Sequence, residues 1–208
     1  MKKIVPYKTA KKALTSLDNG GRFYNLITKA NDGKINSAEL SRVAGLVSGK
    51  QKMILFLEMS LSELSSDSRK VILSTLTSVI KNAIYKYPTQ HLTPSEAVQT
   101  GVLSHNAIIT GIPTYVDSKS DFNGFIMIPI MVGKVTTFMM VPIIDEYEIN
   151  EVKDQKSSET FLIAYTKSSK KFSPKMMTFG GILKELKENE NEDSSFNIYL
   201  KAVTQLYV

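Results

Sequence analysis

Hydroxyl, imidazole and carboxylate side chains that could together form a hydrolytic centre occur in one short stretch of the chain. His91 and His105 are the only histidines, and Ser95, Glu96 and Ser104 lie between them. A serine nucleophile needs an imidazole base that is oriented by an acid, but the G-x-S-x-G elbow that presents such a serine is absent from the sequence. We therefore interpret both histidines as ordinary linker residues and assign no catalytic residue.

Most cofactor and metal chemistry is excluded by composition. The chain has 0 cysteines and 2 histidines, which rules out disulfides, thiolate metal centres and a three-histidine site. Its glycines form neither a G-x-G-x-x-G nor a Walker A pattern. Carboxylates cluster at 145–151 and at 185–193, where they could hold a hard cation or act as acid and base. We interpret both clusters as solvated surface charge and expect no cofactor and no metal.

The segment 28–39 resembles the twelve-residue calcium loop of EF-hand proteins. Gly33 stands at its sixth position and Glu39 at its twelfth, as that loop requires. Its first and third positions, which should supply oxygen ligands, are Thr28 and Ala30. Because calcium takes six to eight oxygen ligands, we interpret this segment as a degenerate EF-hand-like turn between two helices, without calcium.

Two sets of residues are candidates for binding. Basic side chains near the N-terminus could contact phosphates, although the chain's three arginines all precede residue 70 and no nucleic-acid motif is present. The predicted phosphate-contacting residues are Lys2, Lys3, Lys8, Lys11, Lys12 and Arg22. Methionines in the second half can fill irregular gaps in a core, which is the default interpretation, or form an adaptable apolar surface or pocket. The predicted partner-binding residues are Met127, Met131, Phe138, Met140, Met176 and Phe179.

Residues 1–104 are predicted to be helical. Asn36 and Thr93 each have a glutamate three positions later, which is the pattern of a capping box. The run 53–61 is apolar nearly all round, which indicates a buried central helix. Helices are expected at 7–17, 22–30, 37–47 and 53–61, from an N-cap at 65–67 through 87, and after Thr93.

Residues 105–208 are predicted to form strands, because their apolar runs are rich in β-branched and aromatic residues. The polar segment 117–120 has the composition of a turn. Pro129 and Pro142 interrupt apolar runs and place those strands at an edge or a bulge. Gly180-Gly181 predicts a bulge or a bend. Strands are expected at 106–116, 123–132, 135–149, 160–167, 175–183 and 196–208.

The chain is therefore predicted to be an α+β protein, with an N-terminal helical module at 1–104 followed by a mainly antiparallel β-sheet at 105–208 (a meander, a sandwich or an open barrel). The first part has 15 basic and 7 acidic residues, and the second has 11 and 13. The longest apolar run, 125–132, is too short to span a membrane. Together with the lack of a signal peptide, this predicts a cytoplasmic protein.

The predicted function is that of a non-catalytic interaction protein. It would bind a protein partner or a small apolar ligand through the methionine-rich surface or pocket of the strand half. The alternative is nonspecific association with nucleic acid through the basic helical half. An enzyme that uses carboxylates and tyrosine is a third hypothesis.

Overall fold

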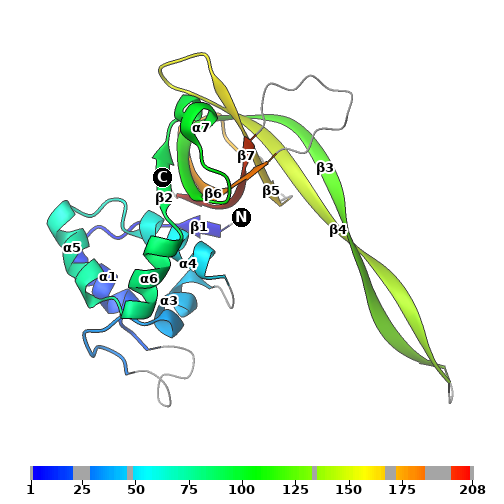
Figure 1. Ribbon diagram of the computed structural model, residues 1–208, viewed down its shortest axis with the longest axis horizontal. Coiled ribbons are helices and arrows are strands. Elements are labelled where there is room, and N and C mark those ends of the chain that lie inside the picture. The colour runs from blue at the N-terminus through cyan, green and yellow to red at the C-terminus, as the bar shows by residue number, and fades with distance from the viewer. Residues whose placement is uncertain are drawn as a thin grey trace.

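The computed structural model describes residues 2–20, 29–45, 49–132, 135–166, 172–185 and 198–206, and along 117–145 it describes the backbone and its pairing. Its elements are β1 Lys2–Ile4, α1 Ala10–Leu17, α3 Ser37–Ala44, α4 Lys50–Ser60, α5 Ser66–Thr75, α6 Ser78–Lys86, β2 Thr89–Leu92, α7 Pro94–Thr100, β3 Asn106–Val132, β4 Val135–Lys153, β5 Thr160–Thr166, β6 Met177–Glu185 and β7 Ile198–Leu206. Helices come first and the long strands follow (Figure 1), which confirms the predicted α+β class.

Two helices begin at the capping residues that the sequence identifies. At α3, the Asn36 side chain accepts the Glu39 N–H at 3.2 Å, and the Glu39 carboxylate accepts the Asn36 N–H at 2.9 Å. Thr93 and Glu96 make the same reciprocal pair at α7, with Pro94 in its first turn. Both capping boxes are therefore confirmed, and each satisfies backbone N–H groups that a helix start would otherwise leave unpaired.

The helical part is built around α4, whose residues 53–60 are all buried. This confirms the predicted central helix. The N-cap predicted at 65–67 is confirmed at Ser65. The single helix predicted from there to 87 is wrong, because α5 ends at Thr75 and α6 begins at Ser78. Ile35 explains the break: its N–H donates to the Thr75 carbonyl and its carbonyl accepts the Thr77 N–H, both at 3.0 Å. A strand-like bridge from a distant segment replaces one helical turn.

Five strands close into a barrel. β3 pairs with β4, β4 with β5, β5 with β7, β7 with β6, and β6 with the start of β3. Only the β5–β7 pairing in this ring is parallel. β2 joins β3 and β1 joins β7, both in parallel. The mainly antiparallel arrangement is thus confirmed, and of the three shapes that the sequence left open the pairing corresponds to a barrel.

The buried apolar residues form two clusters. One surrounds α4 and collects core residues from 4–87 together with Ile108 of β3. The other fills the barrel with Phe161, Phe179 and their neighbours, and Ala97 of α7 belongs to it. β1 and β2 lie in the half predicted to be helical but pair with the barrel strands. The domain boundary between residues 104 and 105 stays a prediction.

Two further sequence predictions need comment. The turn expected at 117–120 is wrong, because Asp117–Ser120 continue β3 and pair with Ile149–Glu146 of β4. The helix expected at 22–30 falls largely on 21–28, which lie outside the described residues.

Candidate functional site: a hairpin arm and a basic hollow

The second half of β3 and the first half of β4 leave the barrel as a two-stranded ribbon. In Figure 1 this ribbon extends away from both the barrel and the helices. We call it the arm and define it by the pairing from Ser120 with Glu146 to Val132 with Val135. At about 3.3 Å per residue, the strand segment 120–132 gives the arm a length of about 40 Å.

Both outer edges of the arm are open within the described part of the chain. β5 pairs with β4 only over Tyr147–Lys153, and β6 pairs with β3 only over Asn106–Gly111. Pro129 and Pro142 therefore lie in edge strands, as their lack of an N–H predicts. A register shift between Phe122 and Phe125 places a bulge beside the pairing of Phe125 with Pro142.

The arm is the most apolar part of the chain. Between Asp121 and Asp145 the sequence contains one charged residue, Lys134. Apolar residues follow one another without alternation along both strands, which is typical of strands that are covered on both faces. A two-stranded hairpin is at best marginally stable alone in water. The sequence of the arm is therefore suited to contact with other apolar surfaces.

The pairing register separates two kinds of apolar residue. Directly opposed residues share a face, and successive residues alternate between faces. One face, which we call the methionine face, carries no β-branched residue except one threonine. Its eight positions are Phe125, Met127, Pro129, Met131, Thr136, Phe138, Met140 and Pro142.

Four of the six predicted partner-binding residues thus share the methionine face: Met127, Met131, Phe138 and Met140. The other two lie elsewhere. Phe179 is fully buried in the barrel core, where its ring packs edge-on against Phe172 with centroids 5.1 Å apart. Met176 is half-buried just before β6. β6, which begins at Met177, pairs with β3 and β7.

Polar contacts hold together the strands from which the arm emerges. The Tyr165 hydroxyl of β5 donates to the Glu148 carboxylate of β4 at 2.5 Å, and both side chains are buried. Burial, and then the neighbouring carboxylate, raise the pKa of Tyr165 above its ordinary value. The Lys201 ammonium of β7 donates to the Tyr147 hydroxyl at 3.0 Å and lies 5.0 Å from the centre of its ring.

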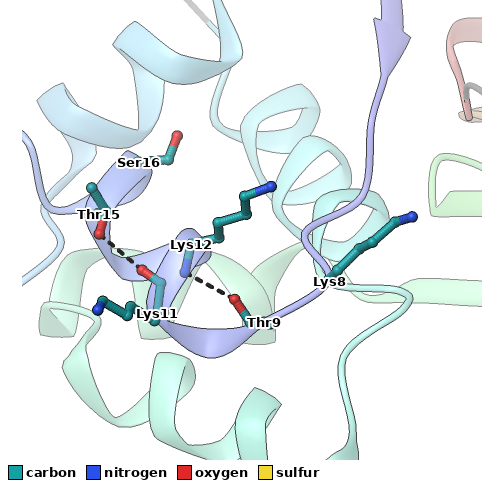
Figure 2. A pocket seen from close by; sticks show the side chains of 6 residues that line it. All are labelled: Lys8, Thr9, Lys11, Lys12, Thr15 and Ser16. Atoms are coloured by element: carbon teal, nitrogen blue, oxygen red, sulfur yellow. Dashed lines mark hydrogen bonds between the residues drawn. The ribbon is translucent and has the colours of Figure 1, made fainter.

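A second candidate lies on α1. A surface hollow of about 410 Å³ is lined by Lys8, Lys11, Lys12 and three hydroxyl residues. Figure 2 shows that Thr9 caps the helix through the Lys12 N–H and that the Thr15 hydroxyl donates to the Lys11 carbonyl. Three of the predicted phosphate-contacting lysines therefore line one hollow, with their ammonium groups pointing in different directions (Figure 2).

The other members of that predicted phosphate-contacting set are not in the hollow. Lys3 is exposed on β1. The side chain of Lys2 and all of Arg22 fall outside what the structure describes. The structure thus groups Lys8, Lys11 and Lys12, which come from the start of α1 and the segment before it.

The residues that suggested hydrolytic or metal chemistry have other partners. The Ser95 hydroxyl donates to Asp154, and the Glu96 carboxylate accepts the Thr93 N–H at 2.8 Å. In the EF-hand-like turn, both Glu39 oxygens accept backbone N–H groups, from Gly20 and from Asn36. Within the described ranges, no three His, Asp or Glu side chains are grouped to hold a metal ion.

Sequence reasoning missed one feature of this region, namely that the methionines belong to a projecting ribbon. The barrel strands pair in the order β3–β4–β5–β7–β6 and back to β3, and the arm occupies the connection between the first two of them. A fold alone does not define a function, which must come from the residues themselves.

No protein-family model matches the chain, and no curated protein matches it. Among the described helices, none is both long enough and apolar enough to cross a membrane.

Proposed function

We propose that this chain is a non-catalytic interaction protein that binds an apolar surface, of a protein partner or a small ligand, through the methionine face of its arm. One observation supports this proposal above the others: the register places three methionines, two phenylalanines and two prolines on one face of a ribbon that projects from the barrel.

The chemistry of the methionine face suits binding. Methionine has an unbranched, polarisable side chain that adapts to irregular surfaces. Aromatic residues and methionine are enriched in the buried centres of protein interfaces, and charged residues are depleted there. The prolines at 129 and 142 remove N–H groups from strand edges and so discourage indefinite strand addition. We therefore expect the arm to make contact through the methionine face and not through its strand edges.

The experiment measures apolar-dye binding by anilinonaphthalene sulfonate at nanomolar to low micromolar protein. We compare the parent chain with the double variant Met127→Lys/Met140→Lys, whose positions are directly opposed on the methionine face. The control is Val79→Lys on α6, where an exposed valine is replaced. We expect the arm variant to lose at least about half of the dye fluorescence, because two lysines interrupt the apolar patch, and the control to lose little.

Equal fluorescence from the parent and the arm variant would contradict the proposal. Circular dichroism and thermal unfolding are recorded for all three proteins, so that a change in dye binding is not mistaken for unfolding.

The basic hollow supports a second candidate, the binding of phosphates of single-stranded nucleic acid. Three lysines and three hydroxyl residues lining one hollow can supply cations and hydrogen-bond donors.

The test of this second candidate is the fluorescence anisotropy of a labelled oligothymidine over a salt series. Lys11→Gln/Lys12→Gln should weaken binding and reduce the log–log salt slope by about 0.7 for each phosphate that the variant no longer neutralises. Lys156→Gln, in the β4–β5 loop, is the matched control; an unchanged slope in the double variant excludes this candidate.

A further inference from the structure

The segment after α1 contains an asparagine–glycine pair, which is the dipeptide most prone to deamidation. Asn19 is exposed, and the following Gly20 is buried with a φ of 65°. Glycine has no side chain to hinder attack of its backbone nitrogen on the neighbouring side-chain amide. Asparagine is for this reason among the labile residues that heat-stable proteins contain less often.

The reaction at such a pair needs only water as co-reactant. The Gly20 nitrogen gives up its proton to solvent and attacks Cγ of Asn19. The new bond between this nitrogen and Cγ replaces the bond from Cγ to Nδ2, and Nδ2 takes up a proton and leaves as ammonia. Water then opens the five-membered imide at either carbonyl, which gives an aspartate or an isoaspartate at position 19. The product carries one more negative charge than the parent chain.

In the structure, a carboxylate holds the nitrogen that would attack. The Gly20 N–H donates to Glu39 Oε1 at 2.8 Å, and Glu39 has no exposed surface. Loss of the Gly20 proton would leave an anionic nitrogen in contact with an anionic oxygen, and this repulsion is stronger in a buried place than in water. The Gly20 nitrogen must therefore separate from Glu39 before it can react.

A second labile pair in the same turn is held in the same way. An aspartate–glycine pair closes the same ring with loss of water, and the chain has this pair at Asp32–Gly33. The Gly33 N–H donates to Asp18 Oδ2 at 2.8 Å, and Asp18 is 6% exposed. The Asp18 carbonyl also accepts the Asn31 N–H at 3.0 Å. Each attacking nitrogen is thus bound to a buried carboxylate from a distant part of the chain.

We propose that Asn19–Gly20 is a deamidation site that the Glu39 carboxylate protects, so that the reaction proceeds only when this turn opens. The site is separate from both the arm and the basic hollow. Burial raises the pKa of Glu39, and the charges of Asp18 and Asp32 raise it further. A new carboxylate at position 19 adds to this repulsion, so a deamidated turn closes less tightly and the contact between α1 and α3 is weakened in one direction only.

Mass spectrometry of tryptic peptides tests the protection, after the full chain has been incubated in its native state at mildly alkaline pH. Trypsin releases residues 13–22, which contain Asn19. A synthetic peptide of the same residues gives the rate without the fold. We expect the folded chain to deamidate at least about tenfold more slowly than the free peptide, because a hydrogen bond to a charged group is strong enough for a factor of this size.

Two variants of α3 separate protection from general stability. Glu39→Ala removes the acceptor of the Gly20 N–H. Asn36→Ala removes the side-chain cap of the same helix, which accepts the Ala38 and Glu39 N–H groups, but it leaves the Glu39 carboxylate in place. We expect Glu39→Ala to deamidate at least about tenfold faster than the parent, and Asn36→Ala to stay within about threefold of it.

The consequence of the reaction is tested by the variant Asn19→Asp, which carries the charge of the product. Its control is Asn82→Asp, at an exposed position of α6. We expect Asn19→Asp to lower the melting temperature more than the control does, and the difference to shrink at high salt, because salt screens repulsion between charges.

Three results would each overturn the proposal: a folded parent that deamidates as fast as the free peptide, equal rates in Glu39→Ala and Asn36→Ala, or equal melting temperatures of Asn19→Asp and Asn82→Asp. The comparison of the parent with the free peptide needs no variant, so it decides the matter even where Glu39→Ala folds poorly. None of these measurements depends on dye binding by the arm or on nucleic-acid binding at the hollow.

Discussion

Replacing Glu39 by alanine should destabilise the whole helical part, because this one carboxylate joins two distant segments. Its Oε1 accepts the Gly20 N–H at 2.8 Å and its Oε2 accepts the Asn36 N–H at 2.9 Å. The side chain has no exposed surface. Alanine would therefore leave two N–H groups without an acceptor, one at the end of the segment after α1 and one at the start of α3.

The magnitude follows from these two orphaned donors. A buried hydrogen-bonding group left without a partner costs about 1–3 kcal/mol. Removing the carboxylate also removes the cost of burying it, which offsets part of this loss. We expect Glu39→Ala to lower the free energy of unfolding by about 2–4 kcal/mol. Glu39→Gln keeps one carbonyl acceptor and should lose about half as much.

Urea unfolding followed by circular dichroism measures these losses, with the exposed Glu63→Ala as the control. A loss below about 1 kcal/mol for Glu39→Ala would refute the assignment of both hydrogen bonds. Unfolding measured over a pH series tests the direction of the pKa shift of Glu39. Burial raises the pKa of Glu39 above 4.5, so the folded state holds the proton more tightly than the unfolded state. The stability gap between the parent and Glu39→Gln should therefore narrow as pH rises above 4.5.

Three other substitutions have expected outcomes. Tyr165→Phe removes the donor to the buried Glu148 carboxylate and should cost about 2 kcal/mol in urea unfolding; a loss near zero would argue against that bond. Hydrogen bonds, first of all from the Ser95 hydroxyl, lower the pKa of Asp154 to about 2. The stabilisation is present above pH 3.8 and is lost as pH falls toward 2, so Ser95→Ala should flatten that part of the melting-temperature profile. Gly181→Ala would place a Cβ 2.4 Å from a backbone carbonyl of β7 and should lower stability by about 1–3 kcal/mol in thermal unfolding; an unchanged melting temperature would contradict this packing.

The features that the sequence predicted correctly depend on local chemistry. A capping box at Asn36 or Thr93 needs only four consecutive residues. The bulge predicted at Gly180-Gly181 is confirmed by a register shift between them, and Gly181 is needed there because a Cβ would lie 2.4 Å from the Lys201 carbonyl oxygen. The strand expected at 160–167 is likewise found, as β5, because one strand's own composition indicates it.

The features that the sequence did not predict depend on contacts between distant segments. β1 has three residues and pairs with β7 at the other end of the chain, so no local pattern marks it. The break between α5 and α6 requires the backbone of Ile35, although 72–87 has the apolar spacing of a single helix. Methionines at 127, 131 and 140 belong to the arm, whereas Phe179 belongs to the core, and only the pairing of the strands separates them.

The arm shows why hydrophobic patterning cannot by itself locate a core. The run 125–132 is the longest apolar stretch of the chain, so burial inside the barrel is the simplest expectation. In the structure this run instead lies in the arm, beyond the pairing of Ser120 with Glu146, where neither β5 nor β6 pairs with it. An apolar pattern predicts that a segment is buried, but it does not say whether the same chain or another molecule provides the contacts that bury it. For the arm we propose that another molecule provides them, and the register, which sets methionine and β-branched positions on opposite faces, says which positions such a contact would use.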